Sequence, residues 1–385
     1  MFEHDALIIG CGLTGAVIAR HLAEEGRRVL ILERRNHIGG NMYDRVDEHG
    51  LLVQVYGPHI FKTNKKNLYD YIHRFEDWNE SKVRLSVVVN GKCLPLPFNF
   101  KTIDEFYSHE DAAKLKRKLK AAFPGQKSAT ILELLDHSDP DIKGYADFLF
   151  ENDYSLYTAK MWGIPPETID KSVLRRVPVR FSYDEGYFDT EYEALPVHSF
   201  TRFFENLLAH ENITVKLGVD ALNHLKAEGS RILFDGDPLT IPVVYTGALD
   251  ELFGNVFGSL PYRSLSFEWE YSDDEAYPYT DSIVSFPQEH AYTRSTEYKS
   301  MLCQKSDGYI YAFEYPSDYV QGGGHDPYYP VLTEQSMKIY AQYRELAGKI
   351  PNLIVCGRLG DFKYYYMEQA LERAIEISHQ LQGEK

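Results

Sequence analysis

The sequence predicts an α/β fold in which a parallel sheet is joined by a helical subdomain and an antiparallel β-sheet subdomain. Three observations lead to this prediction. Apolar runs flank a glycine turn and a helical pattern in the first 40 residues, helical periodicity fills residues 102–176, and polar and apolar residues alternate over 178–200 and 229–320.

The first unit is a strand, a tight turn, a helix and a second strand. DALIIG is a short apolar run, CGLTG is rich in glycine, AVIARHLAEEG has helical period, and RRVLILE is again apolar. A helix between two buried strands implies a βαβ unit with parallel strands.

The next region is mainly helical. TIDEFYSHEDAAKLKRKLKAAF and DPDIKGYADFLFENDYSLYTAKMW both begin with acidic residues and carry apolar stripes. Residues 101–176 are therefore expected to form a separate helical subdomain.

The alternating stretches predict antiparallel strands, as in SLSFEWEYS and DGYIYAFEYP. Between and after them, FFENLLAHENITVKLG, IPVVYTGA and LIVCGRLG with MEQALERAIEISHQLQ return to the strand and helix patterns of the opening unit. We therefore expect a discontinuous parallel-sheet domain over 1–82, 200–250 and 335–385. The antiparallel sheet subdomain is expected over 83–100, 177–199 and 251–334.

Bulk properties exclude several classes. At 385 residues the chain exceeds the roughly 250 to 300 residues at which single cores stop growing. A net charge of −16 disfavours a nucleic-acid partner, because phosphates require a basic face. Any anionic substrate must therefore be bound by local cations.

Targeting and metal signals are not found in the sequence. The four cysteines are widely spaced and form no CxxC or Cys/His cluster, so a zinc site or disulfide framework is not expected. No basic leader precedes the first apolar run and no apolar stretch reaches about 18 residues. We expect a cytoplasmic protein with no membrane partner.

A dinucleotide fingerprint opens the chain. Gly10, Gly12 and Gly15 form G-x-G-x-x-G between the expected strand and helix, and Glu33 ends the second strand 21 residues after Gly12. Glycines let the backbone approach a pyrophosphate at a helix N-terminus, and the carboxylate accepts hydrogen bonds from ribose hydroxyls. The competing interpretation is a tight turn packed for structural reasons alone.

The residues after Glu33 favour FAD over NAD. ERRNHIGGN places Gly39 and Gly40 shortly beyond the acid, as in the extended motif of FAD-binding oxidases and mutases. A second glycine turn near the C-terminus, with Arg358 available to a phosphate, agrees with FAD.

Nearly the whole chain resembles the bacterial UDP-galactopyranose mutases. The similar stretches are GCGLTGAVIARHL, ERRNHIGGN, YGPHIFKTN, LPFN, YTAKMWG, RRVPVRFSYDEGYF, VVYTGALDELF, YRSL, YTRSTEYK, EYP, DPYYPV and GRLGDFKYYYM. The resemblance implies a Rossmann-like FAD-binding domain, a helical subdomain bearing a mobile substrate lid, and a homodimer that supplies polysaccharide biosynthesis.

The resemblance also implies a reaction. Such an enzyme interconverts UDP-galactopyranose and UDP-galactofuranose by attack of reduced flavin N5 on sugar C1, with no net redox change. The protein's task is to orient the UDP-sugar and stabilise the leaving diphosphate. The cofactor residues expected from the fingerprint and the resemblance are Gly10, Gly12, Leu13, Thr14, Gly15, Glu33, Arg34, Gly39, Gly40, Asn41, His59, Val219, Arg358 and Met367.

The resemblance assigns the substrate residues position by position. Arg176 and Arg294 match diphosphate-binding arginines and His59 lies near the flavin ring; these three are the expected catalytic residues. Tyr187, Tyr328 and Tyr364 match tyrosines that bind the same diphosphate, Tyr157 stacks on uracil, and Trp162 lies beside the sugar with Phe188. On the residues alone, Arg175 and Arg180 are equally good surface cations and Trp162 is a packing residue.

Four positions depart from the family pattern. Lys62 replaces a histidine, Val83 stands where asparagine is common, Met161 replaces glutamine, and Tyr366 replaces an aspartate. The departures are either drift or a changed sugar pocket for an N-acetylated or 6-deoxy hexose carried by UDP or dTDP. Of the three consecutive tyrosines, Tyr364 is expected at the diphosphate and Tyr365 in packing.

Two other functions remain open on the sequence. An FAD amine-oxidase-like oxidoreductase shares the glycine motifs, but would need an apolar or amine-binding cavity in place of arginines and tyrosines. A nucleotide-sugar-binding protein that has lost catalysis is also compatible with the four departures.

Overall fold

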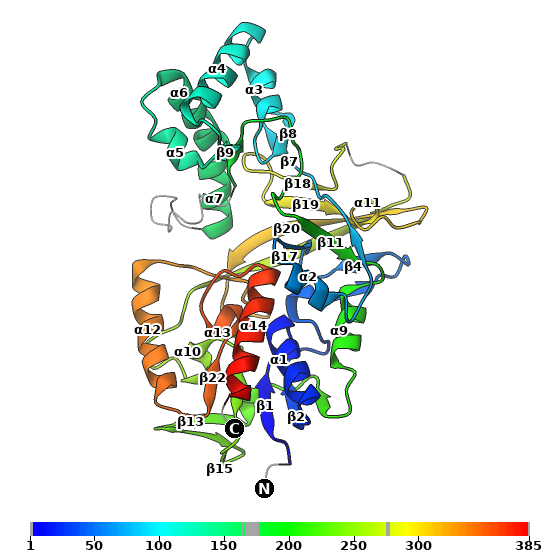
Figure 1. The fold of residues 1–385 in the computed structure, drawn as a ribbon, viewed down its shortest axis with the longest axis vertical. Coiled ribbons are helices and arrows are strands. Elements are labelled where there is room, and N and C mark those ends of the chain that lie inside the picture. Colours follow the sequence, from blue (N-terminus) through cyan, green and yellow to red (C-terminus); the bar gives the residue numbers. More distant parts are fainter. Residues whose placement is uncertain (1–2, 164, 166–176, 275–277, 384–385) are drawn as a thin grey trace.

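The computed structural model describes residues 3–163, 165, 177–274 and 278–383. The chain forms an elongated molecule in three tiers (Figure 1). A parallel sheet with its helices lies at one end, a larger mixed sheet lies in the middle, and a group of helices lies at the other end. Both described chain ends lie at the outer edge of the parallel-sheet tier.

The parallel sheet has five strands in the order β12-β2-β1-β16-β22. All four neighbouring pairs are parallel. The strands are β1 (Ala6–Ile9), β2 (Val29–Leu32), β12 (Ile213–Lys216), β16 (Val243–Tyr245) and β22 (Leu353–Val355). The predicted parallel sheet built from distant parts of the chain is thus confirmed.

The two faces of this sheet pack into separate cores. On β1, Ala6 and Ile8 face one core while Leu7 and Ile9 face the other, as the period of two requires. Helices α1 (Leu13–Glu24), α9 (Phe200–Leu208) and α14 (Met367–Gln382) cover the first face, and α1 packs directly on α14.

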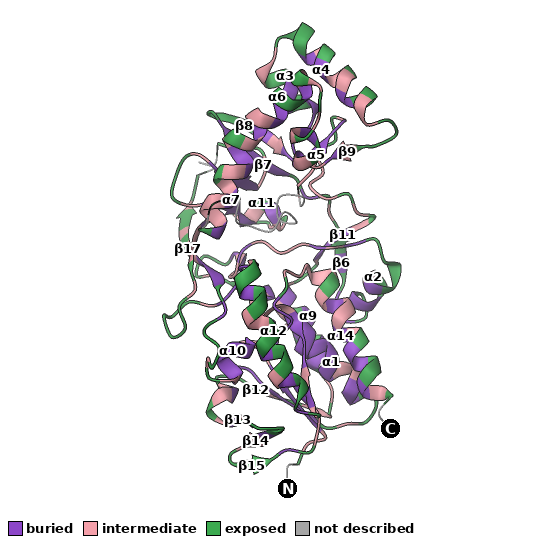
Figure 2. Cartoon of the chain, turned by 90° about the vertical axis from the view of Figure 1, so that its left-hand side faces the viewer, coloured by how far each residue is buried: buried purple, intermediate pink, exposed green. Residues whose placement is uncertain are grey.

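The second face is covered by other elements. They are α10 (Leu249–Leu252), α12 (Glu334–Gly348) and a small meander of β13 (Leu225–Glu228), β14 (Arg231–Phe234) and β15 (Asp237–Pro238). Figure 2 shows that α1 is largely buried, whereas α12 keeps an exposed outer face. A strand buried on both faces explains the continuous apolar runs of the sequence.

The middle tier is a seven-stranded sheet in the order β21-β17-β20-β19-β18-β7-β8. Its strands are β7 (Leu85–Val89), β8 (Lys92–Leu96), β17 (Tyr262–Ser272), β18 (Ile283–Ser285), β19 (Arg294–Glu297), β20 (Tyr309–Asp318) and β21 (Tyr329–Pro330). The expected antiparallel pairing holds except between β7 and β18, which run parallel. These two strands are far apart in sequence, so no hairpin turn fixes their relative direction.

Short elements connect the tiers. Three strands form a sheet in the order β5-β11-β6, namely β5 (Phe61–Thr63), β11 (Tyr192–Pro196) and β6 (Trp78–Glu80). Two further pairs are β3 (Asp44–Val46) with β4 (Leu52–Gln54), and β9 (Ser128–Ala129) with β10 (Val179–Arg180). The remaining short helices are η1 (Gly40–Met42), α2 (Lys66–Ile72), η4 (Ala221–Asn223), α11 (Tyr298–Met301) and α13 (Gly357–Gly360).

The helical tier contains α3 (Phe100–Phe106), α4 (His109–Ala122), α5 (Ile131–Leu135), α6 (Pro140–Leu149) and α7 (Ser155–Trp162). Asn99, Ser108, Thr130 and Asp139 cap the first four of these helices through their side chains. A π-helical turn, η2 (Phe150–Tyr154), joins α6 to α7. Of the helices that the model describes, none is long and apolar enough to cross a membrane.

Candidate active site

A cavity lies between the parallel sheet and the seven-stranded sheet. Its wall includes the glycine turn after β1, the start of α14 and residues of β7, β18 and β19. The carboxyl ends of the parallel strands therefore open toward the larger sheet, as expected for a ligand site of an open α/β sheet.

The glycine turn at this end is built for close approach. A side chain at Gly15 would place its Cβ 2.1 Å from the Gly10 carbonyl oxygen, so only glycine lets α1 pack against β1 here. Gly10 has a φ of 98°, in the left-handed region that favours glycine. The N-cap of α1, Gly12, has no side chain to occupy the first helical amides. This helix N-terminus therefore presents free donors for a pyrophosphate.

Glu33 is held by the backbone at the end of β2. One carboxylate oxygen accepts a hydrogen bond from the Cys11 amide at 2.7 Å, and the other accepts one from the Arg35 amide at 2.9 Å. Next to it, Arg34 forms an ion pair of 2.9 Å with the buried Glu251. The carboxylate is thus fixed at the cavity wall, with lone pairs left for ribose hydroxyls.

The expected cofactor residues lie together. Every one of the fourteen residues predicted for FAD, from Gly10 to Met367, lines this cavity. The glycine cradle, the uncapped helix and the fixed carboxylate fit the pyrophosphate and ribose of a dinucleotide. These residues therefore fit FAD.

His59 is neutral and held by its own backbone. Its Nδ1 lies 2.8 Å from the Gly57 carbonyl oxygen, and its amide and carbonyl are both bonded to the side chain of Gln54. Burial lowers the pKa of His59 to about 4, with smaller contributions from Arg358 and Arg294. Because Nδ1 donates to Gly57, Nε2 is an acceptor toward the cavity at neutral pH.

Arg294 on β19 is oriented by a buried acid. Its Nε donates to one carboxylate oxygen of Glu314 and one terminal nitrogen donates to the other, both at 2.8 Å. Glu314 is only 1% exposed. Burial alone would lower the pKa of Arg294, but Glu314 and the nearby Tyr157 hold it well above its ordinary value. The bidentate pair fixes the plane of the guanidinium and directs its remaining edge into the cavity.

Aromatic rings surround this arginine. Tyr329 lines the cavity, stacks on Tyr364 at 5.2 Å between ring centroids, and carries the Arg358 guanidinium over its face. Trp162 packs behind these two tyrosines together with Met161. Arg294, Arg358 and the phenols form an anion-binding wall.

The structure places Tyr328 and Tyr329 differently from the sequence prediction. Tyr328 is buried at 3% exposure against Tyr56 and Phe267, whereas Tyr329 lines the cavity. Neighbours on a strand point to opposite faces, so only one of the pair reaches the ligand side. The structure thus places Tyr329 at the cavity wall, and the role of Tyr328 in binding the diphosphate stays a prediction.

The three consecutive tyrosines all reach the cavity wall. Tyr364 stacks on Tyr329, and Tyr366 meets Tyr364 edge to face at 5.6 Å. The hydroxyl of Tyr365 donates to Asp361 at 3.0 Å. Tyr365 therefore does more than the packing expected of it.

Lys62 lies between two aromatic rings. Its Nζ is 4.4 Å from the ring centroid of Phe188 and 4.1 Å from that of Tyr366. All three side chains line the cavity, and Phe188 packs on Tyr187. Two of the four departures from the family pattern, Lys62 and Tyr366, are thus in direct contact.

Val83 does not reach the cavity in the part of the chain that the structure describes. It is 8% exposed in a hydrophobic core, while Leu85, two residues later, lines the cavity. The strand period puts both side chains on one face, and Leu85 is the one that the cavity wall includes. Arg176 lies outside the described residues.

Arg180 is not the surface cation that the sequence suggests. It is 7% exposed and donates to backbone carbonyls of the loop that leads to Tyr187 and Phe188. Sequence reasoning also missed Glu314, although EYP was among the similar stretches. An acid flanked by strand residues on β20 gives no signal of its own that it faces an arginine.

Comparisons with known proteins agree with this geometry. A family model for UDP-galactopyranose mutase matches residues 153–364, and one for an NAD(P)-binding Rossmann-like domain matches residues 8–75. A UDP-galactopyranose mutase from Mycoplasma pneumoniae is 35% identical over 98% of this chain and 96% of its own. A dTDP-fucopyranose mutase from Escherichia coli is 34% identical over 97% of each chain.

A solved structure shows the same fold. The crystal structure of a reduced UDP-galactopyranose mutase has a TM-score of 0.72 and 16% identity, covering 99% of this chain and 96% of that one. The nearly full-length relatives and the matched family model both extend over the residues that build the cavity. The chain therefore belongs to the UDP-galactopyranose mutase family, whose members are flavin-dependent sugar-nucleotide isomerases with FAD as the cofactor.

Proposed function

We propose that this protein interconverts UDP-galactopyranose and UDP-galactofuranose. The observation that carries this proposal is the joining of two half-sites in one cavity, the dinucleotide cradle at one end and Arg294 with its phenols at the other. A sugar nucleotide bound to the second half brings its diphosphate to the guanidinium and its sugar toward the flavin end.

The chain's own residues would orient the substrate and stabilise charge. Reduced FAD supplies the nucleophile that the ring exchange requires. Arg294, fixed by Glu314, is aligned to receive the diphosphate as it leaves sugar C1, and Tyr329 and Tyr364 donate to its oxygens. Neutral His59 offers Nε2 as an acceptor at the flavin end.

This arrangement favours a mutase over an amine oxidase. A cationic amine would meet Arg294 and Arg358 in the same cavity, and like charges repel at these distances. A diphosphate carries the charge that the two arginines require. Tyr157 on α7 would stack on the base, and Trp162 supports the sugar end from behind.

A second candidate substrate is a hexose with altered substituents. At the two positions where the sequence departs from the family pattern of a histidine and an aspartate, the wall presents Lys62 between the faces of Phe188 and Tyr366. A 6-deoxy sugar needs no carboxylate acceptor at that place, and an N-acetyl carbonyl can accept from Lys62. The relative named dTDP-fucopyranose mutase, at 34% identity, is consistent with this alternative.

A substrate panel tests the proposal. Dithionite-reduced protein is incubated with UDP-galactopyranose, UDP-N-acetylgalactosamine and dTDP-fucopyranose, and furanose products are separated by chromatography. The highest kcat/KM on UDP-galactopyranose supports the first proposal, and a preference for another donor supports the second candidate. Failure to convert any donor, with UDP still bound, would indicate a binding protein and overturn both.

A single substitution tests the anion wall. Arg294→Ala should abolish turnover, because the leaving diphosphate loses its aligned cation, while the flavin absorbance per polypeptide stays unchanged. Normal turnover in this variant would refute the assignment of Arg294. The flavin content is the control, since Arg294 lies on β19 of the larger sheet and is not part of the glycine turn or of β2, which carry the cradle.

The wider context is carried from the family. We propose a cytoplasmic homodimer that supplies furanose units to polysaccharide biosynthesis, and a three-part division of the chain at about residues 83, 101, 177, 200, 251 and 335. Light scattering of the purified protein tests the dimer.

A further inference from the structure

The loop of residues 182–188 carries two cavity residues, Tyr187 and Phe188, without regular secondary structure. A loop that contributes to a substrate wall must be held in place by something other than a hydrogen-bonded ladder. Two backbone hydrogen bonds hold it, from the Phe100 amide to Ser182 at 2.9 Å and from the Tyr187 amide to Val83 at 2.7 Å, and side chains add contacts from two sides.

The inner side is formed by Arg180. Its guanidinium donates to the carbonyl oxygens of three consecutive loop residues, Gly186, Tyr187 and Phe188, the last at 3.0 Å. The Arg180 backbone amide is bonded to the Phe98 carbonyl oxygen at 2.8 Å, so the base of the side chain is fixed as well. Its ion pair with Asp184 is long, at 3.6 Å, and that carboxylate is exposed. The carbonyl oxygens are therefore the principal partners of this buried cation.

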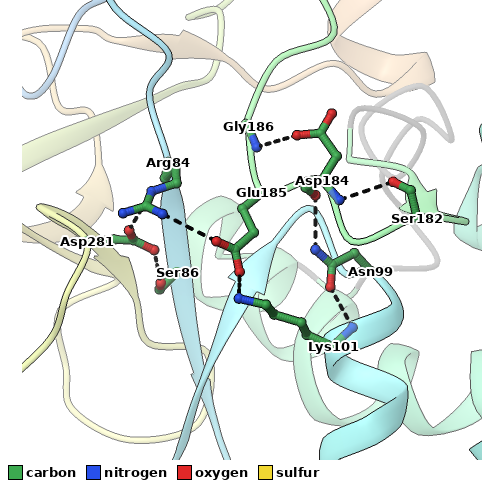
Figure 3. A network of polar contacts seen from close by, with 9 residues as sticks. All are labelled: Arg84, Ser86, Asn99, Lys101, Ser182, Asp184, Glu185, Gly186 and Asp281. Carbon is green, nitrogen blue, oxygen red and sulfur yellow. Dashed lines mark hydrogen bonds and ion pairs between the residues drawn. The ribbon is translucent and has the colours of Figure 1, made fainter.

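The outer side is a network of polar contacts (Figure 3). Asn99 donates from Nδ2 to the Asp184 carbonyl at 3.0 Å, and Glu185 is paired with Lys101 and Arg84. These ion pairs lie on the surface, where solvent screens them. The inner contacts of Arg180 are buried away from solvent, so they should hold the loop more strongly than the outer ion pairs do.

The loop's orientation is passed on to the sugar end of the cavity. With the carbonyls of Tyr187 and Phe188 turned toward Arg180, the Phe188 ring packs on Tyr187 and contacts Lys62 at 4.4 Å. Lys62 in turn contacts Tyr366 at 4.1 Å. One guanidinium thus lies behind a continuous wall of Phe188, Lys62 and Tyr366.

We propose that Arg180 is a positioning residue that sets the substrate wall through the three loop carbonyls. It does not itself line the cavity; it acts through Phe188 and the residues that Phe188 contacts. Arginine suits this role because its planar fork donates in several fixed directions at once, whereas a lysine ammonium is a flexible point donor. The inference rests on the proposed function for its kinetic consequence, but its structural part can be measured separately.

Two substitutions of Arg180 test the proposal. Arg180→Lys keeps the charge but not the fork, and Arg180→Met keeps only the bulk. We expect the amide of Tyr187, which donates to the Val83 carbonyl oxygen at 2.7 Å, to exchange hydrogen at least 10-fold faster in both variants because the loop opens more often, with unchanged flavin content. We also expect KM for the preferred nucleotide sugar to rise about 10-fold, with a smaller change in kcat. The matched control is Arg84→Met, which removes the outer ion pair between Arg84 and Glu185 and should alter exchange and KM by less than twofold.

A double-mutant cycle separates positioning from general loosening. If Arg180 acts through Phe188, then Arg180→Lys combined with Phe188→Leu should raise KM no further than the larger single effect. Additive effects, or wild-type exchange and KM in both Arg180 variants, would overturn the proposal. If Arg180→Met fails to fold, Arg180→Lys carries the test. If the wild-type protein converts no nucleotide sugar, the proposed function fails, while the exchange measurement still decides whether Arg180 holds the loop.

Discussion

At the scale of single residues, the pairing of Arg294 with Glu314 makes a sharp prediction. Glu314→Gln keeps the shape but removes the charge that fixes the guanidinium in a bidentate geometry. We expect kcat/KM to fall by about 100-fold, because removing one pre-oriented electrostatic contact costs about 100- to 1000-fold in rate, with FAD retained.

The control for this change is Glu268→Gln on the neighbouring strand β17. Glu268 is exposed and accepts a hydrogen bond from Tyr315, so the kcat/KM of the Glu268→Gln variant should stay within twofold of wild type. Equal losses in both variants would show that Glu314 has no special role in orienting Arg294.

Asp153 leads to a pH prediction. It is buried in the π-helical turn η2, and burial raises its pKa to about 7 from an ordinary 3.8. Because the folded state binds this proton more tightly than the unfolded state, the stabilising effect is complete below pH 3.8 and is lost as the pH rises through 7. Asp153→Asn removes this dependence.

The stability difference between Asp153→Asn and wild type should therefore grow between pH 5 and pH 7. Each pH unit is worth about 1.4 kcal/mol well below the folded pKa and about half of that at pH 7, so the variant gains about 2 kcal/mol relative to wild type. Thermal unfolding at both pH values measures this, and a constant difference in Tm would contradict the prediction.

For single residues, the sequence predicted which residue types build the site better than it predicted which side chains point into the cavity. The glycine fingerprint was decisive because two of its glycines have separate steric reasons, the φ of 98° at Gly10 and the 2.1 Å approach at Gly15. Choosing between Tyr328 and Tyr329 depended on strand register, which neighbouring identical residues do not reveal. Arg180 is buried against backbone carbonyl oxygens. Every residue has such an oxygen, so the sequence gives no signal for this contact.

At the scale of elements, two cationic side chains hold α7 in place: Lys160 of the helix itself and Arg263 of β17. The Lys160 ammonium donates to the carbonyls of Phe286, Glu289, His290 and Tyr292 at 2.6 to 3.5 Å. Near the C-terminus of the helix, Arg263 donates to the Met161 carbonyl at 2.8 Å, which also suits the helix dipole. The helix that carries Tyr157 and Trp162 is thereby tied to the seven-stranded sheet.

Lys160→Met should loosen α7 without affecting the cofactor. We expect KM for the nucleotide sugar to rise about 5- to 10-fold, because hydrogen bonds from charged donors contribute about 1.5 to 3 kcal/mol each and only part of this reaches the site. Lys143→Met is the control, since Lys143 on α6 contacts only the exposed Asp147 in the described part of the chain. Unchanged KM in Lys160→Met would refute the role of this tether.

The elements themselves were largely predictable from periodicity. The βαβ unit and the last helix are long enough for their patterns to be unambiguous. The parallel pairing of β7 with β18 could not be predicted from periodicity, because each strand is short and the chain between them passes through the whole helical tier. The three-part division of the chain remains a prediction.

At the scale of the whole molecule, a ligand bound in the cavity contacts both the parallel sheet and the larger sheet and thereby stabilises the fold. FAD binds only the folded protein, so at a concentration about 100 times Kd it should stabilise the fold by about 2.7 kcal/mol. Thermal unfolding with and without added FAD should show a Tm higher by several degrees.

Two glycine variants sharpen this test. Gly15→Ala forces α1 away from the Gly10 carbonyl, so its Tm should not respond to FAD, whereas Gly144→Ala, with nothing within 4 Å of the added Cβ, should respond as wild type does. A full FAD response in Gly15→Ala would contradict the cradle geometry.

The order of strands in the parallel sheet also affects biosynthesis. The central strand β1 pairs with β2 at once, but its other neighbour, β16, is translated only after the helical tier and after strands β7 and β8 of the larger sheet. Helix α14, which packs on α1, is translated last of all. A nascent chain still attached to the ribosome thus holds the glycine turn without its flanking strand and helix. Flavin uptake should accordingly follow release of the chain, and the first βαβ unit must stay free of aggregation until then.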